Sequence, residues 1–106
     1  MFCKIEIYVP VSHVQPVKEA LWKMDAGHIG HYDHCVTESP VTGYFRPLKG
    51  ATPYIGVMGS DTRVEEIKLE VVCRAAYAER TVNAVKEAHP YEEPVINVIP
   101  LIQTGL

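Results

Sequence analysis

"FCKIEIYVPV", residues 2–11, alternates apolar and polar side chains, and "VEEIKLEVVCR", residues 64–74, repeats the same alternation. Because successive side chains of a strand point to opposite faces, each stretch predicts a strand with one buried face. The buried faces are expected to consist of Cys3, Ile5, Ile7, Val9 and Val11, and of Ile67, Leu69, Val71 and Cys73. The opposite faces carry Lys4, Glu6 and Tyr8, and Glu66, Lys68 and Glu70.

Helical spacing of apolar residues follows each of these strands. The first helix is expected to begin at Ser12 as N-cap and to end near Gly27, which can adopt the left-handed C-terminal conformation. The second is expected at residues 76–89, where Pro90 ends it. Residues 92–102 supply a last strand.

Between the first helix and the second alternating strand, "SPVTG", residues 39–43, is typical of a hairpin turn flanked by residues 31–38 and 43–48. The element order then predicts an α+β fold of the ferredoxin-like split βαβ type, with two helices on one face of a mainly antiparallel sheet and an extra hairpin. The two alternating strands should be antiparallel neighbours at its centre. At 106 residues, the chain is expected to form a single domain, residues 1–106.

Composition excludes several classes of function. The net charge is −3 and no cluster of Lys or Arg is present, which argues against nucleic-acid binding. No apolar run reaches the length of a membrane span, and the N-terminus does not resemble a signal peptide, so a cytoplasmic location is expected. Three widely spaced cysteines fit reduced thiols better than disulfides, with Cys3 and Cys73 acting as small core residues.

Four motifs carry a resemblance that covers nearly the whole chain. They are "AGHIGHYDHC" (26–35), "GYFRPLKGATPYIG" (43–56), "VEEIKLEVVC" (64–73) and "EAHPYEEPVINVIPL" (87–101). Together they resemble the small domain inserted in proteins of the NIF-three-like (YqfO-type) family, here as a stand-alone chain. The "HPYEEP" segment also resembles CutA proteins. One departure is His31, where the family pattern more often has Asn.

The resemblance implies a CutA/PII-like fold and, from those trimeric relatives, a homo-oligomer with a trimer favoured. Full-length NIF-three-like proteins have a larger flanking domain with a dinuclear metal site, for which this chain has no residues. The resemblance therefore implies the fold and not that metal chemistry.

The "HPYEEP" stretch combines an imidazole, a phenol and two carboxylates, a set that suits a ligand, acid–base or metal site. Tyr91, Glu92 and Glu93 are candidate ligand residues. The alternative is structural, because Pro90 and Pro94 punctuate a helix-to-strand junction with Tyr91 packed between them.

The segment from Ser39 to Arg63 is rich in glycine and long for a connection in a small domain. One interpretation is a ligand or partner loop, in which Arg46 and Lys49 are the cations available to an anion. The other is a loop packed against a neighbouring subunit. No phosphate-binding glycine motif is present.

"GHIGHYDHC", residues 27–35, suggests a metal site, because zinc accepts His nitrogen and Cys sulfur. In an extended strand, however, His34 cannot share a face with both His31 and Cys35. We therefore interpret the segment as a turn entering a strand, with Tyr32 packed toward the core. The alternatives are a closed zinc site in one chain, and a site between subunits that uses His31 or His34 with His89 or Glu92.

The sequence thus predicts a small, non-catalytic, homo-oligomeric domain with a role in binding a small-molecule or protein ligand or in regulation. It contains no recognisable catalytic triad or cysteine–histidine signature. The alternative is a metal-binding, hydrolase-related protein with sites at subunit junctions.

Overall fold

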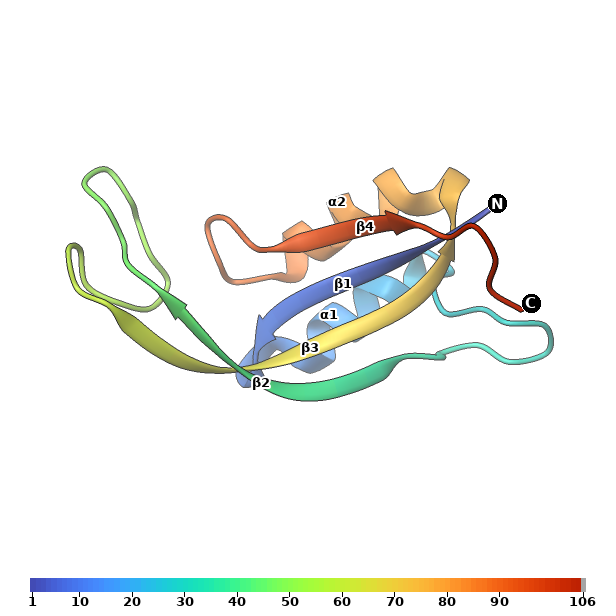
Figure 1. Ribbon diagram of the computed structural model, residues 1–106, viewed down its shortest axis with the longest axis horizontal. Helices are drawn as coiled ribbons and strands as arrows, with labels where there is room; N and C mark the ends of the chain where they lie inside the picture. The colour runs from blue at the N-terminus through green and yellow to red at the C-terminus, as the bar shows by residue number, and fades with distance from the viewer. Residues whose placement is uncertain (106) are drawn as a thin grey trace.

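A four-stranded antiparallel sheet and two helices make up the computed structural model, which describes residues 1–105 (Figure 1). The elements are, in chain order, β1 (Phe2–Pro10), α1 (Val14–Lys23), β2 (Thr37–Phe45), β3 (Thr62–Arg74), α2 (Ala78–Ala88) and β4 (Ile96–Pro100). One turn of 3-10 helix precedes each α-helix, at Val11–His13 and Ala75–Tyr77. The strand order is β2-β3-β1-β4, which confirms the α+β ferredoxin-like fold and the central β1–β3 pair.

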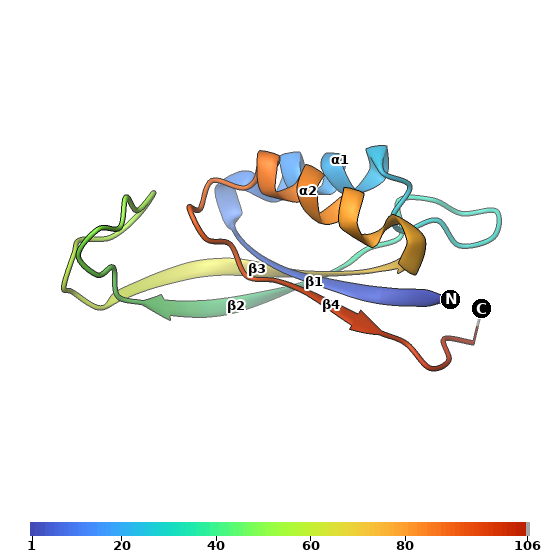
Figure 2. The same cartoon turned by 90° about the horizontal axis from the view of Figure 1, so that it is seen from above.

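Both helices cover the same face of the sheet (Figure 2), and the core lies between the two layers. The alternation of β1 and β3 is confirmed, because Ile5, Ile7 and Leu69 are fully buried. Val11 is the exception: it lies in the 3-10 turn and is 60% exposed. The two α-helices contain 10 and 11 residues, which falls short of a membrane-spanning helix.

The face without helices carries a network of opposite charges across β1 and β3. Lys4 Nζ lies 3.2 Å from Glu70 Oε1, and Lys68 Nζ lies 3.3 Å from Glu6 Oε2 and 3.1 Å from Glu70 Oε1. Hydrogen bonds from Lys68 and then Lys4 lower the pKa of Glu70. Glu6 lies opposite Glu70 in the register, and the two lysines are diagonal to them across the strands, so Lys4 and Lys68 offset the repulsion of the two carboxylates.

The hairpin predicted at residues 39–43 is wrong. Ser39 to Gly43 lie inside β2, which runs without interruption along β3 with Ser39 opposite Lys68 and Gly43 opposite Val64. Pro40 is tolerated because β2 is an edge strand. The chain instead reverses at residues 46–61, named the arm here, which extends beyond the body of the sheet (Figure 1).

Residues 24–36, named the histidine loop, also differ from the predicted strand. The loop contains one isolated bridge, Ile29 to Tyr32, and His34 has a positive φ of 58°. β2 begins only at Thr37, and Tyr32 is 74% exposed and does not pack toward the core. The alternation of side chains along a strand therefore does not separate His34 from His31 and Cys35, because this segment is a loop and not a strand.

The predicted helix ends are corrected as well. Ser12 does not cap α1, because its hydroxyl lies 2.8 Å from His13 Nδ1 and it belongs to the preceding 3-10 turn. α1 ends at Lys23, before the expected stop, and Asp25 takes the first left-handed position with φ 64°. Gly27, with φ 80°, serves another purpose: a Cβ there would lie 2.6 Å from the Cys35 carbonyl oxygen.

Candidate ligand site

A cavity of about 1040 Å³ opens between the arm, the junction after α2 and the uncovered face of the sheet. It brings together all five residues that the sequence nominated as ligand contacts: Arg46, Lys49, Tyr91, Glu92 and Glu93. Two of its walls come from segments about 40 residues apart in the sequence, which only the folded chain places side by side. Whether these five residues bind a ligand stays a prediction.

Glu66 is the cavity residue that sequence reasoning missed. It was placed only on the outward face of β3, yet it is 8% exposed, and its Oε2 accepts a hydrogen bond from the Tyr91 hydroxyl at 2.9 Å. The neighbouring strand makes room for it, because a Cβ on Gly43 would overlap Glu66 Oε1. A glycine in an edge strand, next to a glutamate in its partner strand, was the available signal.

Aromatic rings surround this hydrogen bond and hold the arm against the junction. The Tyr91 ring centre lies 6.3 Å from those of Phe45 and Tyr54, and Tyr54 lies edge-on to His13 at 5.6 Å. The Thr52 backbone N–H also donates to Glu92 Oε1 at 3.0 Å. The arm is thus positioned by contacts at both sides of the cavity.

Burial alters two titratable groups at the junction. Desolvation, followed by the hydrogen bond to Glu66, raises the pKa of Tyr91 well above its ordinary range, so the phenol stays protonated. Desolvation also lowers the pKa of His89, which is 6% exposed. Neutral His89 fits its contacts, since Nε2 lies 2.7 Å from the Tyr8 carbonyl oxygen and Nδ1 accepts from the Tyr91 N–H at 3.2 Å. Both ring nitrogens are therefore occupied within the chain.

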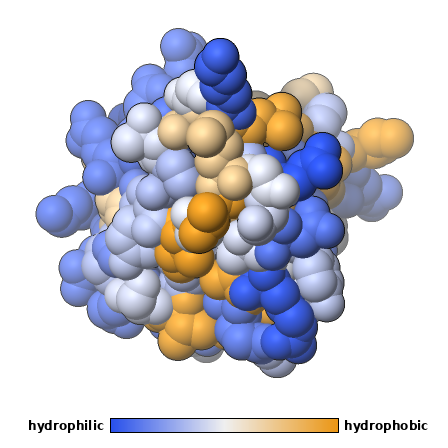
Figure 3. All heavy atoms as spheres, turned by 90° about the vertical axis from the view of Figure 1, so that its left-hand side faces the viewer, coloured by the Kyte–Doolittle hydropathy of each residue, from blue (hydrophilic) through white to orange (hydrophobic). Residues whose placement is uncertain are grey.

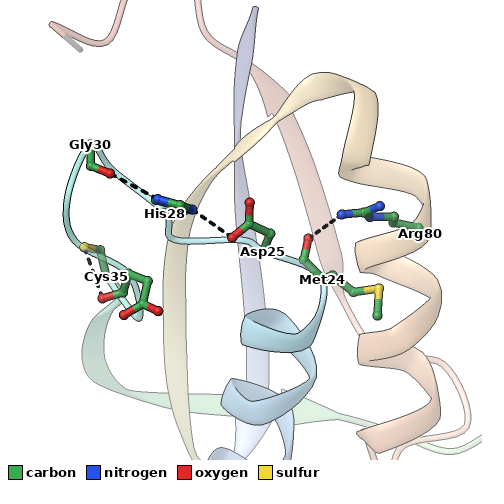
Figure 4. A network of polar contacts seen from close by, with 7 residues as sticks. Met24, Asp25, His28, Gly30, Cys35 and Arg80 are labelled. Carbon is green, nitrogen blue, oxygen red and sulfur yellow. Dashed lines mark hydrogen bonds and ion pairs between the residues drawn. The ribbon is translucent and has the colours of Figure 1, made fainter.

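The histidine loop lies outside this cavity, and His28 and Cys35 form hydrogen bonds within the loop (Figure 4). His28 connects Asp25 Oδ1 at 2.9 Å to the Gly30 carbonyl oxygen at 3.1 Å, while Cys35 Sγ donates to the Asp33 carbonyl oxygen. The hydrogen bond to Asp25 is the main cause of a raised pKa of His28. Arg80 of α2 donates to the Met24 carbonyl oxygen at 3.1 Å and ties the loop to the second helix.

The three histidines proposed as metal ligands are not brought together. His34 stacks on Trp22 with ring centres 3.9 Å apart, whereas His89 belongs to the junction after α2. Among residues 1–105, no group of three His, Cys, Asp or Glu side chains could hold a metal ion. A zinc site within one chain therefore has no ligand set in the described residues, and a site between subunits, using His31 or His34 with His89 or Glu92, stays a prediction.

The chain is similar in sequence and in structure to known proteins. A solved structure of a Bacillus cereus protein related to NIF3 is 38% identical to the chain, with a TM-score of 0.83 over 96% of this chain and 26% of that one. The chain belongs to the NIF-three-like family. No family model matches it. Two curated relatives are the GTP cyclohydrolase 1 type 2 homologs of Halalkalibacterium halodurans, 40% identical over 96% of this chain, and Bacillus subtilis, 41% identical over 95%.

This NIF-three-like chain spans about a quarter of the length of those curated relatives, 27% in both cases. The fold also occurs in a periplasmic divalent cation tolerance protein, CutA, from Archaeoglobus fulgidus, which aligns over 98% of this chain and 87% of its own with a TM-score of 0.72. That pair is 21% identical, so the likeness concerns the fold alone.

Proposed function

We propose that this NIF-three-like domain is a non-catalytic, homo-oligomeric module that binds a small molecule in the cavity between the arm and the β3 face, with a regulatory role. The observation that supports it most is the cavity itself, which joins a buried carboxylate, aromatic walls and charged rim residues. Ligand pockets typically measure about 300 to 1,000 Å³ and combine apolar walls with a few placed polar groups. The cavity of about 1040 Å³ is at the upper limit of that size and combines the same kinds of residues.

Binding suits the contents of the cavity better than catalysis does. The hydrogen bond between Tyr91 and Glu66, together with burial, keeps the phenol protonated, so Tyr91 is a poor nucleophile or base. The two exposed carboxylates, Glu92 and Glu93, and the exposed cations Arg46 and Lys49 line the cavity, where they can orient a ligand.

Self-association is supported by the surfaces at one end and one edge of the sheet. The arm exposes Leu48, Val57 and Met58, and apolar groups break the polar surface at that end of the molecule (Figure 3). β4 is a five-residue edge strand, and two of its own apolar residues, Val98 and Ile99, are exposed. Exposed apolar groups and an uncovered strand edge favour association of copies, and the CutA-like fold favours closure as a trimer.

The ligand site is tested with a saturation-transfer NMR screen of cationic, anionic and neutral aromatic fragments. We expect fragments that bind the native protein to bind more weakly to Ala51→Trp, because an indole at this cavity residue would occupy part of the space and obstruct a ligand. Ala76→Trp is the matched control, since Ala76 is exposed in the 3-10 turn before α2 and does not line the cavity. Absence of any binding fragment, or equal binding to both variants, would contradict the proposed function.

Assembly is tested separately by light scattering at micromolar concentration. The expected mass is about three times the chain mass of 11.9 kDa. A monomer at this concentration would refute the oligomer and leave the ligand site standing.

A further inference from the structure

We infer that the cavity receives a small organic cation, an amine, amidine or guanidinium, whose N–H groups donate to Glu66. This inference rests on the proposed function and names the chemical class of its ligand. It follows from three features: a buried carboxylate with one hydrogen-bond donor, aromatic rings around it, and neighbouring cations that form no ion pair with it.

The carboxylate of Glu66 has capacity for further hydrogen bonds. A carboxylate accepts at four lone-pair positions, and the Tyr91 hydroxyl occupies one of them on Oε2. Within residues 1–105, no second donor to Glu66 is found, although the residue is more than nine-tenths buried. Because a buried charge is costly unless it is paired, Glu66 favours a ligand that brings N–H donors and positive charge.

Neighbouring cations do not supply that charge. Lys68, two residues along β3, is held by Glu6 at 3.3 Å and Glu70 at 3.1 Å and does not line the cavity. Arg46 and Lys49 do line it, but both are exposed, so water and salt screen their repulsion. Glu66 is buried, so water and salt screen its attraction for a cation less than they screen the repulsion from exposed Arg46 and Lys49.

The walls add a second attraction for the same class of ligand. Tyr8, Phe45, Tyr54 and Tyr91 all line the cavity. The faces of aromatic rings attract cations, and planar amidines and guanidinium groups also stack on them. A planar cation can therefore lie against a ring while its edge reaches Glu66.

The shape of the site depends on Gly43. Any side chain there would overlap Glu66 Oε1, so the glycine keeps the carboxylate in the place where it meets both Tyr91 and the cavity. Gly43 has no positive φ, which means that space and not backbone conformation requires glycine at this position.

The test is isothermal titration calorimetry with three compounds of similar shape: benzamidine, neutral benzamide and anionic benzoate. Benzamidine should bind the native protein at least about tenfold more tightly than benzamide, because only the cation can form a charge-assisted hydrogen bond with Glu66. Glu66→Gln should abolish most of this difference. Glu65→Gln is the control, because Glu65 pairs with Arg63 at the surface and does not line the cavity.

Three results would overturn the inference: benzamide or benzoate binding the native protein as tightly as benzamidine, no benzamidine binding, or unchanged benzamidine affinity in Glu66→Gln. The comparison of compounds uses the native protein, so it holds even if the Glu66 variant fails to fold. If the fragment screen finds neutral or anionic ligands in the cavity while benzamidine does not bind, the ligand class is wrong and the binding function stands. If nothing binds in either experiment, both are wrong.

Discussion

The histidine loop and the cavity lie at different places in the fold and use their polar residues in opposite ways. The loop contains three of the five histidines, and most of its reactive groups have near neighbours as partners: His28 bonds Asp25 and Gly30, Cys35 bonds Asp33, and His34 stacks on Trp22 of α1. The cavity has fewer such residues, but Glu66 is buried beside open space with one donor. A carboxylate such as Glu66, which lies beside a cavity and has room for further hydrogen bonds, is therefore a better sign of a ligand site than a cluster of histidines and cysteines that already have partners.

Glycine substitutions should separate the two regions most clearly. Gly27→Ala combines a φ of 80° with a Cβ 2.6 Å from a backbone carbonyl oxygen, so we expect the free energy of unfolding to fall by about 2 to 4 kcal/mol. Urea unfolding followed by circular dichroism measures this. A loss well below that range would mean that the histidine loop is not a fixed structural element.

Gly43→Ala should have a smaller effect on stability and a larger one on binding. The added methyl meets the end of a flexible glutamate, which can move, so we expect a loss of about 1 kcal/mol in unfolding free energy. Displacing the carboxylate should weaken benzamidine binding, the same result that we expect for Glu66→Gln. Thr42→Ala, at an exposed neighbouring position in β2, is the control and should alter neither quantity appreciably.

Removing the ring of His34 tests the loop alone. His34→Ala removes a stacked pair, with ring planes 7° apart, and should lower the unfolding free energy by about 1 kcal/mol. Trp22 is the only tryptophan, so its emission should move to longer wavelength as water reaches the ring. Benzamidine affinity should not change. A matching loss of affinity would show that loop and cavity are coupled, against the comparison drawn above.

The pKa values of His28 and His89 are shifted in opposite directions, so a change of pH should affect their contributions to stability in opposite ways. His28 has a raised pKa, so its interaction with Asp25 stabilises the fold below the ordinary pKa of about 6.5 and is lost as pH rises through the folded value. His89 has a lowered pKa because it is buried, so its neutral form contributes stability above about 6.5 that is lost as pH falls through the folded value.

Ring-proton NMR measures both midpoints, with Asp25→Asn as the control that should lower the midpoint of His28 and leave His89 unchanged. Coinciding midpoints for the two native histidines would contradict the contacts described for one or both of them.

Much of the fold followed from the sequence because its signals are local. The period of two in β1 and β3 correctly placed the buried faces, and helical spacing located α1 and α2. The turn at residues 39–43 was wrong because Pro40 and Gly43, usual turn residues, occupy an edge strand that pairs along the long β3. Tertiary pairing overrode local turn chemistry.

The site was predicted only in part, for a related reason. Arg46, Lys49 and the Tyr91–Glu93 triplet stood out by residue type within unusual segments, and they do line one cavity. Glu66 did not stand out, because the alternation of β3 assigned it to an outward face and nothing local showed that the arm and the junction bury it. The directions of the loop histidines could not be predicted from strand geometry, because they depend on the loop conformation, including the positive φ of His34.

The most direct test of the central claim is an amide chemical-shift map recorded as benzamidine is added to the isotopically labelled protein. The account predicts shifts at Gly43 in β2 and at Ala51 and Thr52 in the arm, with Gly27 and Gly30 of the histidine loop unmoved. Shifts confined to the histidine loop, with the cavity amides unchanged, would contradict it.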